Sequence, residues 1–199
     1  MSRIITISRQ FGSGGREIGK RLAESMGIAY FDKEIITAIA EKSSFSEKYV
    51  HSIVENHNYT YYPITVAKSF SIPYDQLPNA KIHQAQYSVI QNMAAQGDCV
   101  IVGRCSDYIL RDFNPVNIFI YADMETKIAR CQSRAAESEH LSESELRKLI
   151  KSIDRSRAKY YETYTGQQWG EKENYGFCVN TSGYKELKAL ALKIKHFIT

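Results

Sequence analysis

This chain has no apolar run near the ~20 residues that a membrane-spanning helix needs. Its four cysteines are scattered, with no Cys-x-x-Cys pair and no histidine at zinc-ligand spacing. A net charge of +4 is too small to indicate nucleic-acid binding by itself. The N-terminus begins as a strand pattern and has no signal-peptide core. We therefore expect a cytoplasmic globular protein with reduced thiols and with no membrane or nucleic-acid partner.

The N-terminal end of the chain has a strand, a glycine-rich loop and a helix in succession, an order with which many proteins bind phosphate. A β-branched strand pattern over residues 4–7 is followed by the loop Gly12-Ser13-Gly14-Gly15 and then by a helical pattern from Glu17. Glycines leave room for an anion, and the next helix presents free N–H groups and the positive end of its dipole. The order predicts a phosphate-binding loop; the alternative is an ordinary tight connection.

Two residues of the usual nucleotide loop are missing here. That loop reads Gly, four residues, Gly, Lys and then Ser or Thr, where the lysine reaches the terminal phosphates and the hydroxyl reaches magnesium. If Gly15 is the second glycine, Arg16 stands in the lysine place, Glu17 in the hydroxyl place and Gln10 in the first glycine place. Arginine keeps the positive charge and offers a planar fork to phosphate oxygens. Phosphate binding is still expected, whereas the metal ligands are not identified.

Apolar stretches suited to buried parallel strands recur along the chain and are separated by helical patterns. They cover residues 4–7, 28–31, 99–102, 117–121 and 177–179. This alternation predicts an α/β fold with a central parallel sheet and helices on both faces. Cys99 and Cys178 lie inside strand patterns, where we expect small buried side chains.

No strong strand pattern occurs between residues 32 and 97, so this stretch is expected to be a helical insertion. Ser44-Phe45-Ser46-Glu47 has the form of a capping box that begins one helix, and residues 79–96 predict a longer helix that ends at Gly97. Residues 57–78 are rich in tyrosine and proline. They are expected either to form a wall over a ligand or to pack as a surface loop.

A group of arginines follows the strand pattern of residues 117–121. Asp123 is expected to cap a helix that carries Arg130 and Arg134 on one face. After a polar stretch, the capping box from Ser142 to Glu145 predicts a further helix.

That further helix has one apolar stripe, and Arg157 lies on it. The stripe consists of Leu146, Leu149, Ile150, Ile153 and Tyr160. Charge on a buried seam must be paired, and Asp154 lies one turn earlier, where it can orient Arg157. We interpret Arg157 as facing a ligand; the alternative is an internal ion pair. A separate stripe predicts a solvated face and consists of Lys148, Lys151, Arg155 and Lys159.

Taken in order, these motifs resemble the cytidylate kinase-like proteins, relatives of bacterial cytidylate kinase among the P-loop nucleoside monophosphate kinases. The resemblance covers nearly the whole chain. It rests on ISRQFGSGGREIGKRLAE at the start, YFDKEII at residues 30–36, VIVGR at residues 100–104, IDRSRAKYY at residues 153–161 and NTS at residues 180–182. It implies a single three-layer P-loop domain over residues 1–199, with about five parallel strands. Residues 32–97 would bind the nucleoside monophosphate, and residues 135–142 would form a short lid.

The resemblance also implies roles for individual residues. Donor phosphates would lie against Gly12, Ser13, Gly14, Gly15 and Arg16. The acceptor nucleotide would be bound by Asp32, Arg104, Asp154 and Arg157. The catalytic cations would be Arg16, Arg130, Arg134 and Arg157, placed where charge spreads over the transferred phosphoryl group. The implied cofactors are ATP and Mg²⁺, and the implied acceptor is CMP or dCMP.

Three positions depart from the cytidylate kinase pattern on the acceptor side. Ala38 and Ile150 stand where those enzymes carry arginine, and Cys105 replaces an aspartate. Three hypotheses therefore stay open. The first is a kinase for CMP or dCMP, the second is a nucleotide or anion sensor without efficient turnover, and the third is a kinase for another small phosphorylated acceptor.

Overall fold

The computed structural model describes residues 3–54, 78–134 and 141–199, and it confirms the α/β architecture. Five parallel strands form one sheet in the order β2-β3-β1-β4-β5. The strands are β1 (Ile4–Arg9), β2 (Ala29–Phe31), β3 (Cys99–Val102), β4 (Val116–Tyr121) and β5 (Phe177–Asn180). The strand β1 lies at the centre of the sheet. The loop that follows it therefore lies mid-way along the carboxyl edge, where open α/β sheets bind ligands.

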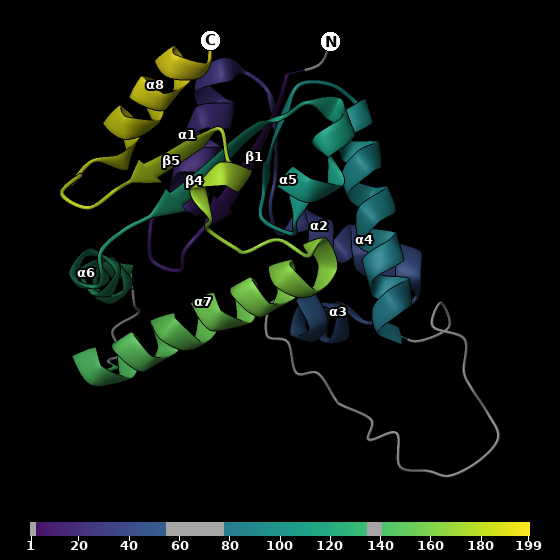
Figure 1. Ribbon diagram of the computed structural model, residues 1–199, viewed down its shortest axis with the longest axis horizontal. Coiled ribbons are helices and arrows are strands. Elements are labelled where there is room, and N and C mark those ends of the chain that lie inside the picture. Colours follow the sequence, from purple (N-terminus) through teal and green to yellow (C-terminus); the bar gives the residue numbers. More distant parts are fainter. Residues whose placement is uncertain (1–2, 55–77, 135–140) are drawn as a thin grey trace.

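Helices cover both faces of the sheet (Figure 1). The helices of the described residues are α1 (Gly15–Met26), α2 (Glu34–Ser43), α3 (Glu47–Val54), α4 (Pro78–Ala95), α5 (Ser106–Ile109), α6 (Met124–Arg134), α7 (Glu143–Thr165) and α8 (Leu187–Ile198). The helices α1 and α8 pack on one face, and α2 to α5 pack on the other. None of these helices is long and apolar enough to cross a bilayer.

The strand β3 illustrates why the central strands are apolar along their whole length. Cys99 and Ile101 join the core under α2 to α5, whereas Val100 and Val102 join the core under α1 and α8. Because successive side chains point to opposite faces and both faces are covered, each residue must be apolar.

The helix α7 begins at the predicted capping box. The Ser142 hydroxyl accepts from the Glu145 N–H at 3.3 Å, and the Glu145 carboxylate accepts from the Ser142 N–H at 2.8 Å. Leu146 and Ile150 are buried as expected, but the prediction for Leu149 is wrong, since that side chain is 39% exposed. Successive residues are turned by about 100° around a helix, which carries Leu149 off the seam that Ile150 defines.

Two other local expectations are wrong. Ser44 ends α2 in a left-handed conformation, and Ser46 caps α3 instead by accepting from the Tyr49 N–H at 3.3 Å. Cys178 is exposed rather than buried, because β5 is an edge strand and Phe177 beside it is exposed as well. All four cysteines are free, as predicted. The expectations for residues 57–77 and 135–140 fall outside the described residues.

Candidate active site

The loop between β1 and α1, residues 10–16, is called the phosphate loop below, and its glycines shape it. Gly12 and Gly14 have φ of +74° and +84°, which favours glycine. A Cβ at Gly14 would collide with Leu187, and one at Gly15 would lie 2.5 Å from the Cβ of Arg9. The Gly14 carbonyl accepts the first helical bond of α1, from the Ile18 N–H at 3.0 Å. The first-turn N–H groups of α1 therefore lie at the edge of the sheet, as anion binding requires.

Arg16, in the place of the usual lysine, forms an ion pair with Asp32. Its Nε lies 2.5 Å from Asp32 Oδ2, and Asp32 is 3% exposed at the end of β2. Arg9, the last residue of β1, lies on the other side of the same carboxylate, with Nη2 3.9 Å from Oδ1. The structure thus joins a residue predicted for the donor to one predicted for the acceptor.

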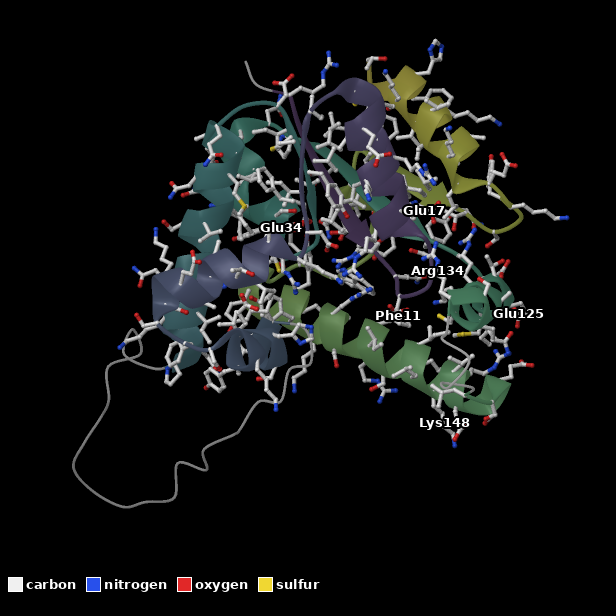
Figure 2. All side chains as sticks on the ribbon, turned by 180° about the vertical axis from the view of Figure 1, so that it is seen from behind. Phe11, Glu17, Glu34, Glu125, Arg134 and Lys148 are labelled. Atoms are coloured by element: carbon white, nitrogen blue, oxygen red, sulfur yellow. The ribbon has the colours of Figure 1, made fainter. Side chains whose placement is uncertain are left out.

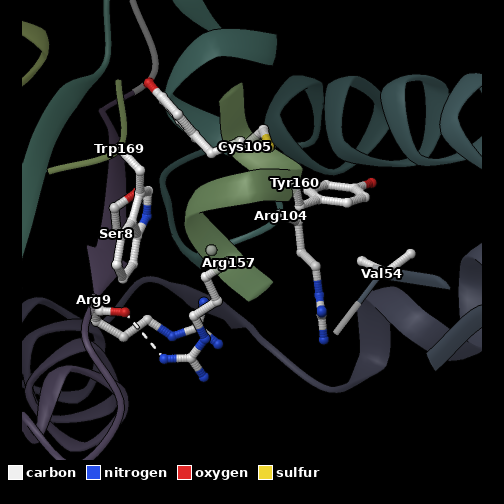
Figure 3. A pocket seen from close by; sticks show the side chains of 10 residues that line it. Ser8, Arg9, Val54, Arg104, Cys105, Arg157, Tyr160 and Trp169 are labelled. Atoms are coloured by element: carbon white, nitrogen blue, oxygen red, sulfur yellow. Dashed lines mark hydrogen bonds between the residues drawn. The ribbon is translucent and has the colours of Figure 1, made fainter. Parts of the chain in front are cut away.

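Arg9 also lines a cavity of about 40 Å³ (Figure 3). Arg104 reaches this cavity from the loop after β3, and Arg157 reaches it from α7. Arg157 donates from Nη1 to the Arg9 carbonyl at 3.1 Å, and its guanidinium carbon lies 5.8 Å from the centre of the Phe11 ring. A cavity of this volume has room for a few water molecules, at ~10–15 Å³ each. Asp32 pairs with Arg9 and Arg16, and Asp154 lies 4.0 Å from Arg157. Arg104 adds a further guanidinium at the cavity, so the positive charge here exceeds the negative charge and attracts an anion.

Strained backbone places Arg104. Gly103, Arg104 and Cys105 have φ of +76°, +61° and +54°, a conformation that is costly for the two residues that are not glycine. The Arg104 carbonyl accepts from Gln86 Nε2 at 2.9 Å, and Gln86 Oε1 accepts from the Tyr160 hydroxyl at 2.8 Å. A buried hydrogen-bond chain thus stabilises the strained turn.

Three aromatic side chains also line the cavity: Tyr160, Tyr161 and Trp169. Trp169 packs edge-on against Phe119, with ring centres 5.3 Å apart, and it packs against the core as well as lining the cavity. Tyr161 donates to Asp107 Oδ2 at 2.7 Å, and Asp107 is 3% exposed. Burial raises the pKa of Asp107 and the pKa of both Tyr160 and Tyr161, so these phenols stay neutral at pH 7.

Asp154 contacts the phosphate loop more closely than it contacts Arg157. Its Oδ1 accepts from the Phe11 N–H at 2.7 Å, and its Oδ2 lies 3.2 Å from Nζ of Lys127. The distance to Arg157 Nη1 is 4.0 Å. Asp154 therefore connects α7 to the loop.

The structure places Arg130 and Arg134 on the β4–β5 side of the phosphate loop, whereas Asp32 and Arg104 follow β2 and β3 on the opposite side. Arg130 donates to the Ser13 carbonyl at 2.9 Å and to the Thr181 hydroxyl at 2.8 Å. It also donates to the carbonyls of Thr181 and Tyr184. Arg130 thus contacts the loop backbone, and its predicted catalytic role stays a prediction.

Arg134 lies further out, at a surface groove along α1. It pairs with Glu17 at 2.5 Å (Figure 2). The groove has a volume of about 380 Å³ and is lined by Arg16, Glu17, Lys20, Arg21, Glu24 and Arg134. Several of these charges pair within the groove. The role predicted for Arg134 at the phosphoryl group also stays a prediction.

The comparison with known families decides what this arrangement belongs to. The model of the cytidylate kinase-like family matches residues 4–183. The chain belongs to the cytidylate kinase-like family. No curated protein matches it.

Solved structures place this cytidylate kinase-like chain among the P-loop kinases by fold. It is similar to an uncharacterized protein from Eubacterium ventriosum, with 26% identity, 98% of each chain covered and a TM-score of 0.68. It is also similar to a shikimate kinase from Bacteroides thetaiotaomicron, with 12% identity, 100% of this chain and 99% of that chain covered, and a TM-score of 0.60. A gluconokinase from Sinorhizobium meliloti is similar too, with 12% identity, 99% of this chain and 91% of that chain covered, and a TM-score of 0.51. At such low identity the two kinases show the fold alone.

The described residues of this family member do not form the usual magnesium site. Glu17, in the place of the hydroxyl ligand, pairs with Arg134 and Arg21, and the Ser13 hydroxyl donates to the Gln10 carbonyl at 2.8 Å. Within the described part of the chain no three His, Cys, Asp or Glu side chains gather as metal ligands.

The sequence patterns did not identify Arg9 and Lys127 as residues of this site. Arg9 directly follows the buried residues 4–8, and a charged residue at the carboxyl end of a central strand is a recognisable signal. Lys127 lies three residues before Arg130, which places both on one face of α6. That spacing could have marked Lys127.

Proposed function

We propose that this protein is a phosphotransferase that moves the terminal phosphoryl group of ATP to a small phosphorylated acceptor, with CMP and dCMP as the first candidates. The observation that carries the proposal is the convergence of Arg9, Arg104 and Arg157, from three separate segments of the chain, on one cavity beside the phosphate loop. Family membership supports the same class of reaction.

The chemistry requires alignment and cations more than covalent help. The N–H groups at the start of α1 would hold the donor phosphates. Arg104 and Arg157 would hold the acceptor phosphate in the cavity, with Arg16 between the two ligands. A phosphate acceptor is already nucleophilic, so no strong general base is required. Mg²⁺ would bind together with ATP and would be held chiefly by the phosphates and water.

A specific observation favours a second candidate, a kinase for a phosphorylated acceptor other than a cytidine nucleotide. Ile150, in a place where cytidylate kinases carry arginine, is fully buried and packs with Ile128 and Leu146. Cys105, in the place of an aspartate, is buried, and burial raises the pKa of its thiol, so it carries no charge. Neither side chain offers a charged contact to an acceptor.

A coupled ADP-release assay over a panel of nucleoside and sugar monophosphates, with and without Mg²⁺, tests both candidates. The variants Arg104→Ala and Arg157→Ala are expected to lower kcat/KM at least 100-fold, because each removes a charge that would hold the acceptor phosphate in line for transfer. Arg155→Ala is the matched control, since Arg155 is exposed on the same helix.

If no acceptor raises ADP above the acceptor-free background, the kinase proposal fails. ATP binding, measured by calorimetry alongside, then decides whether a nucleotide sensor remains. A preference for a sugar phosphate over CMP would favour the second candidate.

A further inference from the structure

Lys127 of α6 is 5% exposed, although lysine is rarely buried without a partner. Its Nζ lies 3.2 Å from Asp154 Oδ2 and donates to Gln10 Oε1 at 3.3 Å. Gln10 is the first residue of the phosphate loop. The ammonium therefore connects the start of the loop to α7.

The loop also packs directly on the backbone of Lys127. A Cβ at Gly12 would lie 3.0 Å from the Lys127 carbonyl oxygen and 3.1 Å from its Cβ. In addition, the carboxylate that pairs with Lys127 accepts from the Phe11 N–H at 2.7 Å. Gln10, Phe11 and Gly12, the first half of the loop, are thus all positioned by Lys127 or by its partner Asp154.

The second half of the loop contacts the same helix. Arg130, one turn beyond Lys127, donates to the Ser13 carbonyl, and the buried Thr181 hydroxyl lies 2.7 Å from that carbonyl. Meanwhile Arg16, in the lysine place of the loop, pairs with Asp32. Two cations of α6 therefore contact the loop: Arg130 donates to its backbone, and Lys127 donates to the Gln10 side chain.

We propose that Lys127 is a positioning residue that shapes the phosphate loop for the donor triphosphate, acting through Gln10 and Asp154. The inference rests on the proposed function, because it concerns the donor side of the same site. The Lys127 ammonium contacts Gln10 of the loop and Asp154, and Asp154 in turn accepts from the Phe11 N–H of the loop. Its charge should therefore set the affinity for ATP and leave acceptor binding nearly unchanged.

The first test replaces Lys127 and measures ATP binding by calorimetry and both KM values by ADP release. Lys127→Met is expected to raise the Kd and KM for ATP at least tenfold and to change the acceptor KM less than twofold. Lys127→Arg, which keeps the charge, should restore ATP affinity to within threefold of the natural protein. Lys148→Met is the matched control, because Lys148 is exposed on α7 (Figure 2). A lower melting temperature with unchanged ATP affinity would overturn the inference.

The second test combines substitutions of Lys127 and its partner Asp154 and measures ATP binding. Lys127→Met leaves the Asp154 carboxylate without its ammonium, and Asp154→Asn removes that charge while keeping an oxygen for the Phe11 N–H. The double variant should bind ATP at least threefold more tightly than the product of the two single effects predicts. Independent effects would overturn the inference.

Binding of ATP to the natural protein distinguishes a failure of the proposed function from a failure of the role proposed for Lys127. If the natural protein binds no ATP, the proposed function fails on the donor side. If it binds ATP and Lys127→Met binds it equally well, the present inference alone fails.

Discussion

Arg9 reaches the cavity because two glycines leave room for its side chain. Gly15 lies against its Cβ, and Gly103 lies against its guanidinium, with no space for a Cβ at either position. Arg9 is the last residue of the buried strand β1, so pairing with β4 holds its backbone in place. The two glycines then decide where its charge points.

Gly103→Ala is expected to displace the Arg9 guanidinium and to lower kcat/KM for the acceptor at least tenfold. Gly27→Ala is the control, because Gly27 also has a left-handed φ, +66° against +76°, but a Cβ there meets nothing within 4 Å. In both variants, backbone strain should lower the unfolding free energy measured in urea by about 1–2 kcal/mol. Equal kinetic effects in the two variants would contradict this account.

At the scale of the element, α7 organises the site through helical spacing. Asp154 contacts the phosphate loop, Arg157 reaches the cavity one turn later, and Tyr160 enters the core one turn after that. The helix begins at the Ser142 capping box and ends at Gly166, whose φ is +70°. One continuous helix therefore fixes where the loop contact, the cavity guanidinium and the core ring lie relative to one another.

Ser142→Ala should lower the unfolding free energy by about 1 kcal/mol, the usual cost of losing an N-cap. We expect kcat and KM to change little, because Asp154 lies about three turns from the cap. Urea unfolding and the ADP-release assay check both parts. The control is Ser144→Ala, an exposed position in the same first turn. An equal loss of stability there would show that the cap is not the cause.

At the scale of the whole molecule, burial of Asp107 affects stability as a function of pH. Its carboxyl is buried, and burial raises its pKa above the ordinary 3.8. The folded state therefore binds this proton more tightly than the unfolded state does. The stabilisation is fully present below the ordinary pKa and is lost as the pH rises through the folded pKa.

Asp107→Asn should flatten the fall in unfolding free energy between pH 4 and pH 7 by at most about 1.4 kcal/mol per pH unit. Urea unfolding at several pH values measures the slope. Asp112→Asn is the control, because Asp112 is exposed nearby. Parallel profiles for the natural protein and Asp107→Asn would refute the predicted linkage.

The sequence by itself determined the strands, the Ser142 cap and the glycine loop, because each depends on residues close together in the chain. It also determined the family, because several separate motifs occur in order along nearly the whole chain. Arg104 and Arg157 were also predicted near one ligand, and they line one cavity. The cap at Ser44 was predicted wrongly, because Ser44 and Ser46 offer the same side chain and only the end of α2 distinguishes them.

Only the tertiary structure decided which partner each charge meets. The Phe11 N–H meets Asp154, 143 residues away, and Arg130 meets Ser13, 117 residues away. Such contacts depend on how α6 and α7 pack beside the loop, which no local pattern encodes. The same packing brought Arg9 and Lys127 into the site, because a buried charge is stable only where folding supplies its counter-charge.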